Sequence, residues 1–129
     1  MSPGDGVRLE VTKLSTYGDF VGVNLRISLS RTLGPGSILV ADGSSKTIWG
    51  IDPISGAKTA ISVAGLLGFP RGIALDSGGQ IVVGDSTTNQ IVRIDPSTGV
   101  QTLLSSGGFD DVAGIAVESD GHILASDIN

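Results

Sequence analysis

The sequence contains no cysteine, so no disulfide framework, thiolate metal site or cysteine nucleophile can form. It has one histidine, and only Glu10 and Glu118 of its acidic residues are glutamates. Aromatic residues are scarce at 4% and charged residues make up 16%, whereas apolar residues reach 40%. This composition is typical of a globular protein rather than of a disordered chain. The 129 residues suffice for one domain with a buried core.

Basic residues and long apolar runs are also in short supply. Eight lysines and arginines against thirteen acidic residues leave a formal net charge of −5, which repels a phosphate backbone, so we expect no nucleic acid partner. The longest mostly apolar run, residues 61–69, falls well short of the roughly 20 residues that a membrane-spanning helix needs. The opening MSPGDG lacks the basic and then apolar pattern of a signal peptide. The sequence therefore predicts a soluble protein with no membrane association, in an unknown compartment.

What the sequence does contain is a repeat. The stretch GSILVADGSSKTIWGIDPISGAKTAI at residues 36–61 matches GQIVVGDSTTNQIVRIDPSTGVQTLL at residues 79–104 without a gap, at a constant shift of 43 residues. A third, partial copy follows, since RGIALDSGGQIVVGD at residues 71–85 recurs as AGIAVESDGHILASD at residues 113–127, shifted by 42. Periods of about 40 to 50 residues are typical of propeller blades or of helical repeats.

The local pattern favours strands over helices. One period contains four short runs rich in Ile, Val and Leu, none with a helical period and each bounded by turn residues: 72–76, 80–85, 90–95 and 100–105. The sequence therefore predicts an all-β fold of β-propeller blades, each a meander of four antiparallel strands. The small residues Gly72, Ala74 and Gly84 suit inner strands that are crowded between neighbouring blades.

The stretch FPRGIALDSGGQIVVGDSTTNQIVRIDPSTG, residues 69–99, resembles the NHL-type repeat of six-bladed propellers. That group includes the gluconolactonase/regucalcin-like enzymes and the streptogramin lyase. The resemblance covers roughly residues 36–129 and implies a propeller fold. It leaves the activity open, because this fold hosts enzymes and plain binding scaffolds alike.

Residues 1–35 depart from the repeat. Apolar and polar residues alternate in residues 7–15 and 20–30, which predicts two half-buried strands joined at TYGD. We interpret residues 1–35 as a divergent N-terminal hairpin that belongs to the first blade, with residues 20–30 in the first-strand position. Residues 36–129 would form the propeller repeats, in a single domain overall.

The strand count amounts to about three blades per chain, with the last two strands of the final blade missing. Propellers typically close with four to eight blades, so one chain cannot form a ring, whereas two chains could form six blades. The sequence therefore predicts a homodimer that closes a ring, in which the N-terminal strand of one copy completes the last blade of the other. The alternative is that the chain is a piece of a longer protein.

Several aspartates recur at turns. Asp42, Asp85 and Asp127 each follow the second strand of a copy, where a carboxylate can accept N–H groups of the next turn. In IDPSTG, Asp95 can accept from turn amides and Gly99 can supply a positive φ. We predict a structural role for these five residues. The rival interpretation, a ring of carboxylates around a cation, would require the first three to point to one centre.

Four other residues are candidates for ligand binding. Asp110 and Asp111 lie in a loop that enters an inner strand, where paired carboxylates near a channel mouth could bind a cation or a basic ligand. Arg71 could bind an anion from the same kind of loop or pair with Asp76. His122 begins a second strand beside a glycine turn, where a solvated side chain is the simpler interpretation.

The resemblance also raises an enzymatic alternative. A gluconolactonase-like enzyme would hold a divalent metal such as Ca²⁺ through oxygen ligands, one of them from the residue before the first-strand glycine. Arg71 and Ala113 occupy those positions here, and neither supplies an oxygen ligand. A streptogramin-lyase-like site would need a His and Glu acid–base pair, and the single histidine supports no Ser/His/Asp triad either.

The sequence accordingly assigns no catalytic residue, metal ligand or cofactor. It favours a non-enzymatic binding or assembly module whose partners are a second copy of the chain and a protein or small molecule at the channel mouth. The alternative is a fragment or oligomeric form of a metal-dependent hydrolase or lyase, with Ca²⁺ as its cofactor.

Overall fold

The computed structural model describes residues 7–10, 15–17, 20–22, 28–31 and 36–128, with side-chain surroundings from residue 36 onward. All regular structure within these residues is β-strand, and every strand pairing is antiparallel. The predicted all-β fold is thus confirmed. In the described part of the chain, no helix is long and apolar enough to cross a membrane.

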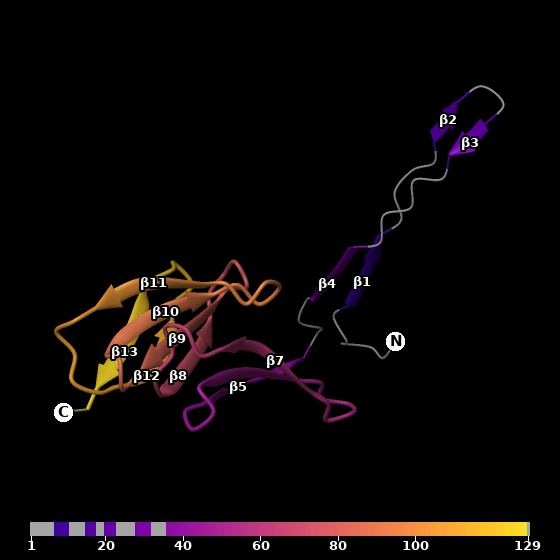
Figure 1. Ribbon diagram of the computed structural model, residues 1–129. Helices are drawn as coiled ribbons and strands as arrows, with labels where there is room; N and C mark the ends of the chain where they lie inside the picture. Colours follow the sequence, from indigo (N-terminus) through magenta and orange to yellow (C-terminus); the bar gives the residue numbers. More distant parts are fainter. Residues whose placement is uncertain (1–6, 11–14, 18–19, 23–27, 32–35, 129) are drawn as a thin grey trace.

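A four-stranded meander occupies the middle of the chain (Figure 1). Its strands are β8 (Pro70–Leu75), β9 (Ile81–Asp85), β10 (Gln90–Ile94) and β11 (Gln101–Ser106). They lie in the order β11-β10-β9-β8, so each strand forms hydrogen bonds with the strands that precede and follow it in the chain. This sheet is the complete blade that the repeat predicts, and we call it blade 2.

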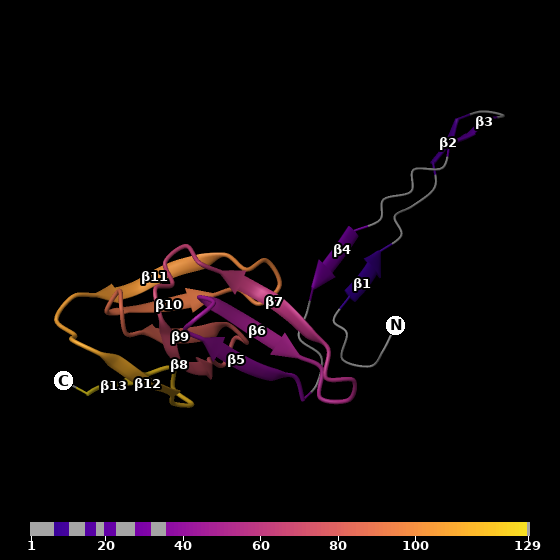
Figure 2. The ribbon, with the colours of Figure 1, turned by 60° about the horizontal axis from the view of Figure 1, so that its bottom comes forward.

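Two further sheets flank blade 2. Blade 1 consists of β5 (Ile38–Asp42), β6 (Thr47–Ile51) and β7 (Lys58–Val63), and blade 3 consists of β12 (Val112–Val117) and β13 (Ile123–Asp127). Strand β8 contacts both β5 and β12, which places blade 2 between the other two, as Figure 2 shows. The repeat in the sequence is therefore a stack of blades in the structure.

The N-terminal strands pair among themselves. Strand β1 (Val7–Glu10) pairs with β4 (Ser28–Arg31), and β2 (Ser15–Tyr17) pairs with β3 (Phe20–Gly22). This is a hairpin around the predicted turn. Among the described strands β5 pairs with β6, so the assignment of residues 20–30 to the first-strand position of blade 1 stays a prediction.

Strand β9 is buried along its whole length because it lies between two cores. Side chains alternate between the faces of a strand, so Ile81 and Val83 face one core and Val82 the other. The first core joins blades 1 and 2 and comprises Ile48, Ile61, Leu67, Ile81, Val83, Val92 and Ile94. The second joins blades 2 and 3 and comprises Val82, Ile91 and Val112. A strand covered on both sides contains a nearly continuous apolar run, which in β9 is Ile81–Val83.

Small residues allow blades 2 and 3 to approach closely. A Cβ added at Gly72 would lie 2.5 Å from the carbonyl oxygen of Ala113, and one added at Gly84 would lie 2.7 Å from Cγ1 of Val112. Both distances are shorter than ordinary van der Waals contact. Glycine at these two positions is therefore a packing requirement of the blade interface, as the predicted crowding of the inner strands implies.

Candidate functional site

A buried carboxylate joins the end of β9 to the loop that enters β8. Asp85 is fully buried, and its Oδ2 accepts hydrogen bonds from the N–H groups of Gly68 at 2.7 Å and Phe69 at 2.9 Å. Its Oδ1 accepts from Thr87 at 3.1 Å and Thr88 at 2.9 Å in the turn that follows β9. Several N–H donors compensate the carboxylate for its lost hydration, so Asp85 ties the end of β9 to the loop before β8.

Blade 3 repeats this arrangement at Asp127. Its carboxylate accepts from the N–H of Asp110 at 3.1 Å and from that of Asp111 at 3.0 Å. In both blades the two N–H donors lie 17 and 16 residues before the aspartate that accepts from them. The main chain of the predicted acidic loop is thus held by a third aspartate.

The turn aspartates of blades 1 and 2 accept local hydrogen bonds. Asp42 accepts from the Ser45 hydroxyl at 2.7 Å and from the Ser44 N–H at 3.1 Å. Asp95 accepts from the hydroxyl and the N–H of Ser97 at 2.6 and 2.8 Å. In each case the serine hydroxyl is the largest cause that holds the pKa of the aspartate below its ordinary value.

Gly99 closes the turn that Asp95 begins. It has a φ of 76° and donates its N–H to the carbonyl oxygen of Asp95 at 2.8 Å. This left-handed conformation is open to glycine at little cost, because other residues place a Cβ against the backbone. A Cβ added at Gly99 would clash with the backbone carbonyl of Ile61 in blade 1, and the Gly99 carbonyl oxygen accepts from the Ser62 hydroxyl at 3.0 Å. The turn therefore helps to join two blades.

Arg71 and Asp111, both candidates from the sequence, lie together. Nη1 of Arg71 is 2.9 Å from Oδ1 and 3.1 Å from Oδ2 of Asp111, with side chains 40% and 31% exposed. Arg71 does not pair with Asp76, which instead lies 3.1 Å from Nε of Arg93. The Arg71 and Asp111 charges balance each other across blades 2 and 3. A ligand-binding role for Arg71, Asp110 and Asp111 stays a prediction.

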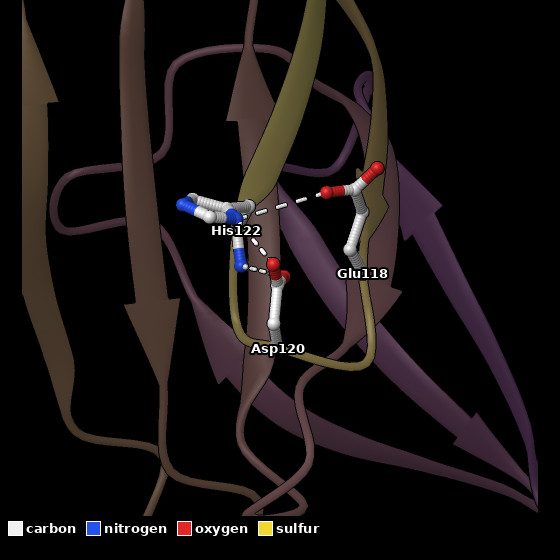
Figure 3. Close-up of side chains that lie close together, drawn as sticks. All are labelled: Glu118, Asp120 and His122. Carbon is white, nitrogen blue, oxygen red and sulfur yellow. Dashed lines mark hydrogen bonds and ion pairs between the residues drawn. The ribbon is translucent and has the colours of Figure 1, made fainter.

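His122 lies at the opposite end of blade 3 from Asp127, in the turn between β12 and β13. Figure 3 shows its ring beside two acidic side chains. Nδ1 lies 2.7 Å from Oδ2 of Asp120 and 3.8 Å from Oε2 of Glu118, and the His122 N–H donates to Oδ1 of Asp120 at 3.1 Å. One ligand-type atom from each side chain lies within 4.8 Å of the others.

Imidazole and carboxylate groups are ligands that Zn²⁺ accepts, so this trio could hold a divalent metal. All three side chains are more than half exposed, and the Asp120–His122 hydrogen bond is a contact within one turn. Sequence reasoning proposed His122 but missed Glu118 and Asp120. The signal in the sequence was their spacing, because Glu118, Asp120 and His122 are every second residue through one β-turn.

Shallow hollows lie on the two end blades. One of about 390 Å³ on blade 1 is lined by Val40, Ala41, Asp42, Gly43, Trp49, Ile51 and Lys58. The other, of about 320 Å³ on blade 3, is lined by Gly114, Ile115, Ala116, Leu124, Ala125 and Ser126. In the first, Nζ of Lys58 lies 5.9 Å from the centre of the Trp49 ring, within the range of a cation–π contact. Both linings are mostly apolar or small.

Comparison with protein families identifies the repeat itself. The family model of the NHL repeat matches residues 67–94, which span the loop held by Asp85 and strands β8, β9 and β10. The chain thus carries an NHL repeat in blade 2, and the resemblance noted in the sequence is confirmed. Among curated proteins, no match to the chain was found. The match supports a β-propeller repeat module in general terms.

Proposed function

We propose that this chain is a non-enzymatic β-propeller module that acts by binding and assembly, and that its first partner is a second copy of itself. The observation that carries the proposal is the uncovered apolar surface on both end blades. Ile38 of blade 1 is 49% exposed and Leu124 of blade 3 is 53% exposed, whereas Ile81 and Val82 of blade 2 are fully buried.

The physics of repeats supports self-assembly. A blade buries its faces only when neighbours stack on both sides, and the stack gains stability with each interface. Propellers typically reach this state as rings of four to eight blades. Two copies of a chain with three blades would supply six, the number in the propellers that the repeat resembles.

The candidate polar residues support a binding role over catalysis. Arg71 and Asp111 form an ion pair between blades, and Asp85 and Asp127 bind backbone N–H groups. His122 lies at the other end of blade 3 from these residues, so the structure does not gather them into one site. Such polar groups serve the stacking of blades, which is what an assembly module requires.

The solution mass tests the proposal. We expect light scattering on a size-exclusion column to give twice the chain mass of 13.0 kDa across a tenfold dilution. A species of one chain mass at every concentration would contradict self-assembly. Circular dichroism on the same fractions would establish that the sample is folded β-structure in either case.

The alternative, a metal-dependent hydrolase or lyase, draws on one observation, the trio of Glu118, Asp120 and His122. Under that hypothesis Ca²⁺ or Zn²⁺ raises the melting temperature, a chelator reverses the rise, and His122→Ala abolishes it. Ser119→Ala is a matched control, because Ser119 is an exposed residue of the same turn that lies outside the trio. No metal-dependent shift would leave the binding module as the only proposal.

A further inference from the structure

We propose that two copies of the chain bind head to tail, with the uncovered face of β12–β13 in one copy packed against the uncovered face of β5–β7 in the other. This inference rests on the proposed self-assembly and specifies its two surfaces. We call the side of a blade that contacts the next blade in chain order its forward face, and the side that contacts the preceding blade its rear face.

The contact between blades 2 and 3 defines the first pair of faces. On the forward face of blade 2, Val82 and Ile91 belong to a core with Val112 on blade 3, and Ile115 and Ile123 of blade 3 pack against it. The two glycines of blade 2, described above, bring its backbone against β12. The forward face of a blade thus combines small residues with aliphatic ones.

The contact between blades 1 and 2 defines the second pair. Ile48 and Ile61 on the forward face of blade 1 share one core with the rear face of blade 2, which comprises Ile81, Val83, Val92 and Ile94. Leu39 and Ala41 of blade 1 pack against this core. They precede Val82 and Gly84 by 43 residues, so the same repeat positions form the forward face in both blades.

The forward face of blade 3 carries these positions, but no blade packs against it among the residues that the structure describes. The pair Ala116 and Leu124 lies opposite each other across β12 and β13, as Ala74 and Val82 do across β8 and β9, 42 residues earlier. Gly114 and Ser126, which stand 42 residues after the two glycines of blade 2, complete the face. Leu124 is 53% exposed where Val82 is fully buried. This face lines the hollow on blade 3.

The rear face of blade 1 is the missing complement. The cross-strand pairs Ile38/Ile51 and Val40/Trp49 repeat Ile81/Ile94 and Val83/Val92 of blade 2 in the same register. In blade 2 these residues are buried against blade 1. In blade 1, Ile38 is 49% exposed, and Val40, Trp49 and Ile51 line the other hollow.

The occupant of each uncovered face is therefore present in the chain itself. A forward face packs against a rear face at both interfaces inside the chain, and the part of the chain that the structure describes leaves one of each uncovered. Blade 3 offers the small residues Gly114, Ala116 and Ser126, while blade 1 carries the bulky Trp49 where blade 2 has Val92. Two copies would satisfy both contacts at once, with two identical interfaces and closed symmetry.

The test places opposite charges on the two faces. We expect Leu124→Asp and Ile38→Lys each to elute with one chain mass, because each puts a charge into both apolar interfaces. Mixed in equal amounts, the two variants should give a particle of two chain masses. In that particle one interface is unaltered and the other pairs the introduced Asp with the introduced Lys. The matched control is Leu103→Asp on β11, since Leu103 is 44% exposed and lies on neither end blade; it should stay a dimer.

The outcomes separate the two proposals. A wild-type protein of one chain mass would overturn self-assembly, and this inference with it. A wild-type dimer that persists in both variants would overturn the head-to-tail contact alone. Dissociation of only one variant would also overturn the head-to-tail contact. In that case the face altered in that variant would pair with the same face of the second copy. Circular dichroism of each variant, together with recovery of the dimer on mixing, distinguishes a lost interface from a lost fold.

Discussion

Arg71, on the first strand of blade 2, and Asp111, in the loop before blade 3, form an ion pair with both carboxylate oxygens within 3.1 Å of Nη1. The sequence presents them as binders of opposite ligands, an anion and a cation. The structure shows that the repeat, shifted by 42 residues, brings the start of one blade against the start of the next. The charges of Arg71 and Asp111 are thus matched between blades 2 and 3.

A double-mutant cycle with Arg71→Ala and Asp111→Asn measures this pair. Because both side chains are partly exposed, we expect a coupling free energy of about 0.2–1 kcal/mol in urea unfolding. The coupling should fall at high salt, since exposed charges are screened. Asn at position 111 retains the N–H that binds Asp127, so the loop keeps its anchor. A coupling that salt leaves unchanged would contradict this account.

Asp85→Asn should destabilise the protein strongly, by about 2–4 kcal/mol, because it removes a charge that accepts several backbone N–H bonds in a buried site. The amide also places an NH₂ group toward N–H donors. Asp42→Asn is the matched control at the same repeat position, where the aspartate is more exposed, so its loss of stability should be clearly smaller than that of Asp85→Asn. Urea unfolding midpoints compare the two. Equal losses of unfolding free energy in the two variants would show that the burial of Asp85 does not increase its contribution to stability.

Gly72→Ala and Gly114→Ala form a second matched pair. Alanine at position 72 meets the backbone of β12, so we expect a loss of about 1–3 kcal/mol in unfolding free energy. Alanine at position 114 meets only the Ser126 hydroxyl, at 3.0 Å, and should leave the isolated chain nearly unchanged. It should weaken the proposed dimer, where a neighbouring backbone would approach. Unfolding and dissociation curves of both variants measure these effects, and a stable Gly72→Ala protein would contradict the packing argument.

The strands were predictable because two local signals agree. Aliphatic runs such as IVV in β9 stand between Gly, Asp and Pro turns, and the shift of 42 or 43 residues aligns each run with its copies. Turn contacts of aspartates could also be read from the sequence, since Asp95 and Ser97 are two residues apart. These features depend on neighbours in the chain, which a single sequence displays.

Contacts between distant residues were less accessible. Asp85 reaches N–H groups 16 and 17 residues earlier because antiparallel β8 and β9 bring those residues to one edge. Arg71 finds a partner 40 residues away, although the nearer Asp76 looked equally suitable. Glu118 and Asp120 join His122 through the geometry of one turn. Side-chain direction decides all three cases, and residue type alone does not encode it.

The serine contacts of the turn aspartates predict how stability depends on pH. The Ser97 hydroxyl is the main cause that lowers the folded pKa of Asp95, and the Ser45 hydroxyl does the same for Asp42. A lowered folded pKa means that the unfolded chain binds the proton more tightly. The stabilisation is therefore complete above the unfolded pKa and is lost as the pH falls through the folded pKa. In a carboxyl NMR titration, Ser97→Ala should raise the pKa of Asp95 and leave that of Asp42 unchanged, while Ser45→Ala does the reverse. If neither variant changes the pKa of the aspartate that its serine contacts, the hydroxyls do not stabilise these carboxylates.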